Sequence, residues 1–266
     1  MNMLEFFQQV LPTEGFYVTT VINTDGRKQG FFKTVDELAQ VCERLDKTKN
    51  NTYFAISAFK QKGNRKQDNV RATKVIAIDV DCGPTKPYPS WKEGLSALGK
   101  FVDEMGLPKP MIIHSGNGLH VYWLLEKELP PEDWRPLAEA MKQAAIDKEF
   151  KIDAGLTANS ALVLRPIGTH NPKNGNEVKL LVPSKPIDNM VIQDCLSYYY
   201  RRDVRSDSSS SQDNSLLSNL ASNQEYQPAI GSIVATKCKQ IEWAMANQDK
   251  VDEPLWYSMI GVAAFC

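Results

Sequence analysis

The hydrophobic positions of this chain change their spacing along its length, which predicts short strands that alternate with helices. Runs of β-branched and aromatic residues between turn signals indicate strands. Apolar residues three and four positions apart indicate helices, which here begin at a capping residue or a proline. On this basis we expect strands at 16–22, 29–33, 52–59, 75–80, 110–114, 119–125, 161–165 and 177–182. We expect helices at 4–10, 34–45, 90–105 and 130–148.

Two of the predicted strands define the centre of the fold. Residues 75–80 are apolar on both faces except at Asp79 near the end, which is typical of a strand covered on both faces. In the strand 119–125, His120 and Tyr122 share one face, and Trp123 lies on the other. Strands and helices in this order predict an α+β fold in which helices back a largely antiparallel sheet.

The alternation of predicted strands and helices ends at about residue 200. Residues 205–228 are polar and rich in serine, so we expect a flexible linker there. A helical pattern resumes at Ala229 and continues to Cys266, where we expect the start of a longer helical domain that the sequence cuts off. The expected organisation is a folded domain at 1–204, a linker at 205–228 and a helical segment at 229–266.

The composition of the chain is that of an ordinary globular protein. The 266 residues are 42% hydrophobic with a net charge of −1, which suits a globular chain with a full core. No apolar run is long enough to span a bilayer, and the N-terminus lacks a signal-peptide pattern, so we expect a cytosolic protein. The five cysteines are scattered, which argues against a structural zinc site and against a disulfide framework.

Two aspartates lie at the end of this predicted central strand. Asp79 and Asp81 are two positions apart, so both carboxylates project from the same face of the strand. Two negative charges at the end of a buried strand are unfavourable unless cations neutralise them. Carboxylate oxygens suit Mg²⁺ or Mn²⁺, which usually also coordinate substrate phosphates. The alternative is an ordinary strand end, where such pairs also occur.

The segment just before this strand is basic. Residues 60–74 contain six lysines and arginines and one acidic residue, Asp68. A solvated loop is the simplest interpretation. Its place directly before the aspartate strand also allows it to meet phosphates.

A glycine-rich turn precedes one of the histidines. Two glycines in four residues let a backbone approach a ligand and expose N–H groups to an anion. His120 follows closely enough to donate to a phosphate, although a simple hairpin with a satisfied histidine is the alternative. His114 stands before the turn and could as easily be structural. The turn consists of Ser115, Gly116, Asn117 and Gly118.

Further polar residues follow later in the chain. Asp153 is either a third carboxylate or a helix-capping or turn residue. Arg165 and Lys173 lie in a loop punctuated by proline and glycine, where an arginine fork and a lysine charge suit phosphate recognition. His170 lies in the same loop, and the sequence assigns it no role.

Taken in order, these motifs resemble the archaeo-eukaryotic primase superfamily, in the form carried by phage and plasmid primase-polymerases. The resemblance covers about residues 51–183. Its three main motifs are Ile78–Asp81, Ser115–His120 and Ile152–Asp153. Similar phage primases also carry counterparts of Asn69–Val70, Cys82–Tyr88, and Val163–Asn171 with Lys173. The first motif has Asp rather than Glu at its second position, which the family allows.

The resemblance implies a catalytic core with an RRM-like antiparallel sheet beside a smaller N-terminal α/β unit. It also implies that Asp79, Asp81 and Asp153 hold two divalent ions, Mg²⁺ or Mn²⁺. His120 would contact the triphosphate of the incoming nucleotide. The expected further contacts to nucleotide or template come from Ser115, Gly116, Asn117, Gly118, Arg165 and Lys173.

The implied activity is template-directed nucleotidyl transfer. The protein would be a DNA primase, or a primase-polymerase, that uses NTPs or dNTPs on single-stranded DNA in phage or plasmid replication. A replicative helicase in the same or another chain is a conceivable partner. Two alternatives stay open: a two-metal nuclease, which needs the same carboxylates, and a non-catalytic single-stranded-DNA-binding module of a replication initiator. The sequence does not distinguish NTPs from dNTPs.

Overall fold

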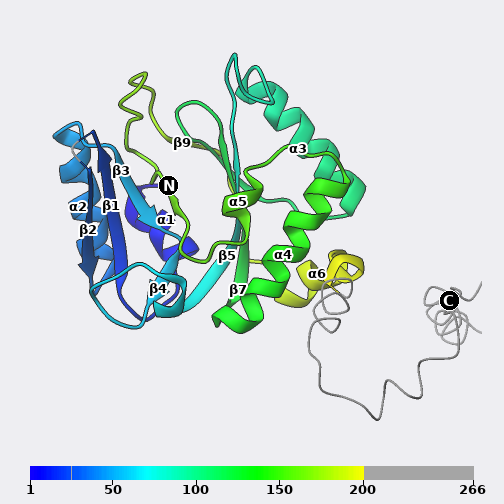
Figure 1. Cartoon of the computed structure of the whole chain (residues 1–266), viewed down its shortest axis with the longest axis horizontal. Coiled ribbons are helices and arrows are strands. Elements are labelled where there is room, and N and C mark those ends of the chain that lie inside the picture. Colours follow the sequence, from blue (N-terminus) through cyan, green and yellow to red (C-terminus); the bar gives the residue numbers. More distant parts are fainter. Residues whose placement is uncertain (25, 201–266) are drawn as a thin grey trace, which may run out of the picture. The chain divides into compact units, whose positions relative to one another are not determined.

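The computed structural model describes residues 1–24 and 26–200, which form two sheets with helices packed on them (Figure 1). The smaller sheet has the strand order β2-β1-β3-β8, and the larger has the order β4-β5-β7-β6-β9. The strands are β1 (Tyr17–Asn23), β2 (Gly26–Phe32), β3 (Thr52–Ala55), β4 (Ser57–Phe59), β5 (Val70–Val80), β6 (Met111–His114), β7 (Leu119–Leu129), β8 (Val163–Leu164) and β9 (Lys179–Val182). The helices are α1 (Met3–Val10), α2 (Val35–Lys47), the 3₁₀ turn η1 (Gln67–Asn69), α3 (Trp91–Met105), α4 (Pro131–Asp147), α5 (Ala154–Thr157) and α6 (Asn189–Cys195).

The N-terminal third forms a small α/β unit. β1 and β2 pair as the predicted hairpin, with Asn23 opposite Gly26 at its tip. Thr34 caps α2 by accepting a hydrogen bond from the Glu37 N–H at 3.2 Å, as the sequence indicates. β3 pairs with β1, and β8, from much later in the chain, completes this sheet.

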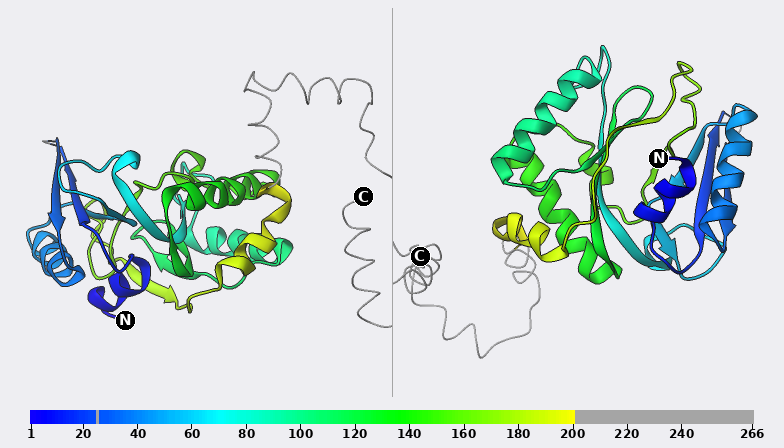
Figure 2. Two further views of the ribbon diagram at one scale, coloured as in Figure 1. Left: turned by 90° about the horizontal axis from the view of Figure 1, so that it is seen from below. Right: turned by 180° about the vertical axis from the view of Figure 1, so that it is seen from behind.

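The larger sheet contains a β-α-β-β-α unit made of β5, α3, β6, β7 and α4, with β7 between β5 and β6. All of its strand pairings are antiparallel. The helices α3, α4 and α6 lie on one side of this sheet, and the N-terminal unit lies on the other (Figures 1 and 2). The expected α+β fold with an RRM-like sheet and a smaller N-terminal unit is confirmed.

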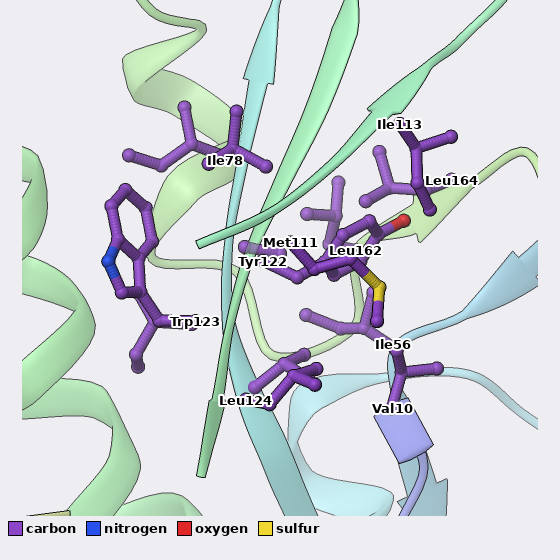
Figure 3. Packing of buried hydrophobic residues seen from close by; sticks show 14 of the residues in the cluster. Val10, Ile56, Ile78, Met111, Ile113, Tyr122, Trp123, Leu124, Leu162 and Leu164 are labelled. Atoms are coloured by element: carbon purple, nitrogen blue, oxygen red, sulfur yellow. The ribbon is translucent and has the colours of Figure 1, made fainter. Parts of the chain in front are cut away.

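The alternation of side chains along β7 separates two packing layers. Trp123 and Ile78 lie on the side of the helices, whereas Tyr122 lies on the opposite side with Met111 and Leu162 (Figure 3). All five side chains are buried. The Trp123 indole N–H donates to the Pro108 carbonyl at 2.8 Å, so burial leaves this polar group satisfied. Asp79 pairs with His120, and Ala77 pairs with Tyr122. Because side chains two positions apart share a face, Asp79 and His120 lie on the same face as Tyr122, towards the N-terminal unit.

The prediction of a single strand at residues 52–59 is wrong. Residues 52–59 do not form one strand, because the chain passes at Ile56 from the smaller sheet (β3) to the larger one (β4). The buried Ile56 donates its N–H to the Leu162 carbonyl at 3.1 Å, so the break lies between two sheets and not in solvent. No glycine or proline marks it.

Smaller differences concern the later part of the chain. β8 has two residues rather than five, and the short helices α5 and α6 were not predicted. No helix in the described ranges is both long and apolar enough to cross a bilayer. The linker predicted at 205–228 and the helical segment predicted at 229–266 lie outside the described residues and stay predictions.

Candidate active site

Asp79 and His120 are direct neighbours across β5 and β7. They occupy opposite register positions, and His120 Nε2 lies 4.0 Å from Asp79 Oδ1. The His120 side chain is 3% exposed and that of Asp79 is 24% exposed, so the carboxylate opens to solvent while the imidazole beneath it does not. The sheet register therefore brings together two motifs that are 41 positions apart in the sequence.

Asp153 lies beside the same strand end. Its backbone N–H donates to the Asp79 carbonyl at 3.2 Å. Its Oδ1 atom accepts a hydrogen bond from the Gly155 N–H at 3.1 Å and caps α5. The structure thus shows the capping role that the sequence left open, and it places this capping residue next to Asp79.

The electrostatics of Asp79 reflect the clustering of carboxylates. Burial and, to a smaller extent, the charges of Asp81 and Asp153 raise its pKa, Arg165 and Lys86 lower it, and the net result is a pKa of about 7. Asp79 is therefore a carboxylate that is hard to ionise without an added positive charge.

The donor set of this cluster fits a hard divalent cation, since it consists of carboxylate oxygens. Within the described residues, however, no three such side chains are close enough as they stand to hold one ion. Asp81 pairs instead with Lys86, at 2.7 Å, and Asp153 caps α5. Cation binding at Asp79, Asp81 and Asp153 requires these side chains to turn away from their present partners.

His120 is a neutral imidazole at physiological pH. Burial and, to a smaller extent, the charges of Arg165 and His114 together lower its pKa to about 3. Its Nδ1 atom is buried without a hydrogen-bond partner among the described residues, as are the Tyr122 hydroxyl and Arg165 Nε. Buried polar atoms are normally hydrogen-bonded, so these atoms mark places where a ligand or water would contribute partners.

The Ser115–Gly118 turn is held by its own hydrogen bonds. The Ser115 N–H donates to the Gly118 carbonyl at 2.9 Å, and the Gly118 N–H donates to Ser115 Oγ at 3.1 Å. A Cβ atom at Gly118 would overlap the Val80 carbonyl oxygen, and one at Gly116 would lie 2.6 Å from Asn171 Cβ. Both glycines are thus required by packing against the protein, which the expected approach to a ligand does not explain.

The same turn has two backbone N–H groups that are left unpaired by the residues the structure describes. In the described chain, the N–H groups of Gly116 and Asn117 donate to no protein acceptor. The turn also borders a cavity of about 250 Å³ whose wall includes His114. The remaining lining residues are Trp91, Gly116, Asn117, Asn176, Glu177 and Lys179.

The Cys82–Tyr88 loop, which belongs to the sequence resemblance but was assigned no chemistry, connects the three motifs. Cys82 at its start accepts a hydrogen bond from the Asn117 side-chain amide. Tyr88 at its end accepts one from the Lys151 N–H at 2.9 Å, two residues before Asp153. Between these anchors, Lys86 lies over the Asp81 carboxylate. The Cys82–Tyr88 loop is therefore part of the candidate site.

Arg165 reaches this region from the smaller sheet. It follows β8, and its Nη2 atom donates to Asn51 Oδ1 at 2.9 Å and to the Tyr53 hydroxyl at 2.6 Å. The guanidinium also lies 4.6 Å from the Tyr53 ring centroid, in a cation–π contact. Its charge acts on both Asp79 and His120. Arg165 therefore supplies positive charge to the site from the opposite sheet.

The end of the Arg165–Lys173 loop has a different environment. The His170 imidazole pairs with Asp46 at 2.9 Å, and the His170 N–H donates to the same carboxylate at 2.7 Å, so this histidine fastens the loop to α2. Lys173 is exposed, and its N–H donates to Asn171 Oδ1. Among the described interactions, Lys173 has none with the three carboxylates.

Some basic side chains of the segment 60–74 are occupied by contacts within the protein. Arg71 forms ion pairs with Glu14 at 3.0 Å and with Glu128 at 2.7 Å. Lys62 lies 5.6 Å from the Phe16 ring centroid. The acidic partners come from distant parts of the chain, so the excess of positive charge in this stretch of sequence is smaller in the fold.

Comparison with known proteins was made at the level of sequence and of structure. No protein-family model matches the sequence, and no curated protein matches it. The structure is similar to the AEP domain of the cyanophage S-2L primase-polymerase, with a TM-score of 0.56 at 13% identity over 73% of this chain and 96% of that one. It is also similar to primase RepB′, with a TM-score of 0.54 at 12% identity over 93% of this chain and 76% of that one.

At these identities the likeness concerns the fold. The motif residues of β5 and β7, and the segment that carries Asp153, lie together at one edge of this fold. The chain has the fold of the archaeo-eukaryotic primase-polymerase domain, as its sequence motifs predicted.

Proposed function

We propose that this protein is a DNA-templated nucleotidyltransferase of the primase type, which synthesises primers on single-stranded DNA in phage or plasmid replication. The observation that carries the proposal is the convergence of Asp79, His120 and Asp153 at one strand end. The register of β5 and β7 joins the first two, and a backbone hydrogen bond joins Asp79 to Asp153. The fold is one that primases and primase-polymerases also have.

Asp79, Asp81 and Asp153 would hold two divalent ions, Mg²⁺ or Mn²⁺. Their oxygen donors suit these ions, and the raised pKa of Asp79 indicates a carboxylate that gains most from a nearby cation. When bound, such ions lower the pKa of an attacking 3′-hydroxyl and stabilise the charge of the leaving pyrophosphate.

The residues around the carboxylates would bind and orient the nucleotide. His120 is neutral and buried, so it can donate a hydrogen bond to a phosphate oxygen without bringing a mobile proton into the site. Arg165 would offset charge that develops on the phosphates. The N–H groups of Gly116 and Asn117 would bind an anion from the turn.

The test is a primer-synthesis assay on single-stranded DNA of mixed sequence. NTPs and dNTPs are supplied separately, each with Mg²⁺ or Mn²⁺, and labelled products are resolved by length. We expect products that require template, nucleotide and metal together. A parallel reaction with labelled single strands, metal and no nucleotide tests the nuclease alternative. Degradation there, with no synthesis in the first assay, would overturn the proposal.

A further inference from the structure

Lys86 forms a direct ion pair with one of the three site carboxylates. Its Nζ atom lies 2.7 Å from Asp81 Oδ2. The two side chains are 46% and 51% exposed, so the pair lies at the mouth of the site. The charge of Lys86 also acts on Asp79 and so offsets part of the repulsion within the carboxylate cluster.

The surrounding loop holds the backbone of Lys86 in this place. The Lys86 N–H donates to the Gly83 carbonyl at 3.0 Å, and the Gly83 N–H donates to the Tyr88 carbonyl at 2.9 Å. The loop ends are fastened by Asn117 on one side and by Lys151 on the other. Only the four-carbon side chain of Lys86 is left free to turn, and lysine carries its charge on a flexible stem.

A divalent cation at Asp81 would compete with the Lys86 ammonium, because both bind the same carboxylate. Two positive groups at one carboxylate repel each other, so the cation would have to displace the ammonium in order to bind there. The displaced ammonium would then stay within side-chain reach of the site, since its backbone is fixed. A nucleotide phosphate that the cation attracts would then offer the ammonium a new partner.

We propose that Lys86 exchanges partners during the reaction cycle: it pairs with Asp81 in the metal-free protein and binds the triphosphate of the incoming nucleotide once divalent metal is bound. This inference rests on the proposed function. It assigns Lys86 two successive roles. Lys86 first neutralises Asp81 in the absence of metal and then binds the nucleotide. Asn117 and His120 would hold the same triphosphate from the other side of the loop.

The exchange predicts opposite effects of one substitution on two ligands. In Lys86→Met the competitor of the metal is absent, so we expect Mn²⁺ alone to bind about two- to fivefold more tightly, the range of one exposed ion pair. The same variant should bind dATP at saturating Mn²⁺, without template, about three- to tenfold more weakly. Free Mn²⁺ is measured by electron paramagnetic resonance, and dATP binding by calorimetry.

Lys100→Met is the matched control. Lys100 also forms an ion pair, with Glu104 at 3.6 Å, but on the exposed face of α3. This variant should leave both affinities unchanged. Raising the salt concentration should reduce the gain in Mn²⁺ affinity of Lys86→Met, because salt screens exposed charges.

Three results would overturn the inference. If wild type binds Mn²⁺ and dATP and Lys86→Met equals it in both, Lys86 has neither role, while the proposed function stands. If Lys86→Met binds Mn²⁺ more weakly, the lysine supports the carboxylates and does not compete for them. If wild type binds no Mn²⁺, the inference and the proposed metal site both fail.

Discussion

The raised pKa of Asp79 makes the stability of the metal-free protein depend on pH. The folded carboxyl, with a pKa of about 7, still holds its proton near pH 6, whereas the unfolded one releases its proton at about pH 4. The stabilisation from this proton is complete below about pH 4 and is lost as the pH rises to about 7. A bound cation would remove this loss, because it favours the ionised form.

Asp79→Asn should therefore stabilise the metal-free protein. The amide stays uncharged at every pH, so at pH 8 in EDTA we expect the variant to gain on the order of 2 to 4 kcal/mol in the free energy of unfolding. The difference should shrink as the pH falls towards 5. Thermal unfolding across this pH range measures it, and Mn²⁺ should reverse the order by stabilising wild type alone. A variant less stable than wild type at pH 8 would contradict this account of Asp79.

The sequence was more informative about some residues than about others. The pairing of Asp79 and Asp81 on one face follows from strand alternation alone. The partner of Lys86 does not, because a lysine in a proline-containing loop carries no periodic signal, and its position depends on anchors at Asn117 and Lys151. The position of Asp153 next to Asp79, which depends on the hydrogen bond between their backbones, likewise could not be predicted from the sequence.

At the scale of elements, the Ser115–Gly118 turn sets where β7 begins and hence the register of His120. The turn is pressed against the end of β5, since a Cβ atom at Gly118 would overlap the Val80 carbonyl oxygen. The Gly118 N–H also closes the turn onto Ser115. The glycine therefore fixes the relation between the strands of Asp79 and His120.

Gly118→Ala should destabilise the protein by about 2 kcal/mol or more, because the added methyl group meets backbone that cannot move aside. Gly99→Ala is the control. It lies within α3 with nothing within 4 Å of its added Cβ, and it should stabilise the protein by about 0.5–1 kcal/mol. Urea unfolding measures both. Equal effects of the two substitutions would show that the close packing at Gly118 has no energetic weight.

Most helices and strands could be predicted from the sequence, but the strand break at Ile56 could not. Helix caps such as Thr34 and the left-handed Gly106 after α3 are local signals, and the structure has them where the sequence indicates. The break at Ile56 is not local. It occurs because β3 pairs with β1 and β4 pairs with β5, and pairing partners so distant in sequence leave no mark on residues 52–59.

At the scale of the molecule, two sheets contribute to one candidate site. β5 and β7 of the larger sheet carry Asp79 and His120, and the end of β8 in the smaller sheet carries Arg165. The positive charge of Arg165 reaches both residues from across the sheets. No sequence pattern predicts that two sheets meet here, since the expectation for Arg165 was only a contact to nucleotide or template. Lys173 lies on a loop fastened to α2 by His170, and its expected contact to nucleotide or template stays a prediction.

The central claim, that Asp79 and Asp81 are catalytic, is tested most directly by measuring nucleotide incorporation in a double variant that replaces both carboxylates by neutral amides. Asp79→Asn with Asp81→Asn is compared with wild type and with Asp103→Asn plus Asp133→Asn, which makes the same charge change on α3 and α4. Template-dependent incorporation of labelled nucleotide is measured with Mn²⁺. We expect wild type and the control to synthesise primers, and the site variant to remain folded and lose at least about a thousandfold in rate. Primer synthesis by the site variant at a rate near wild type would contradict the assignment.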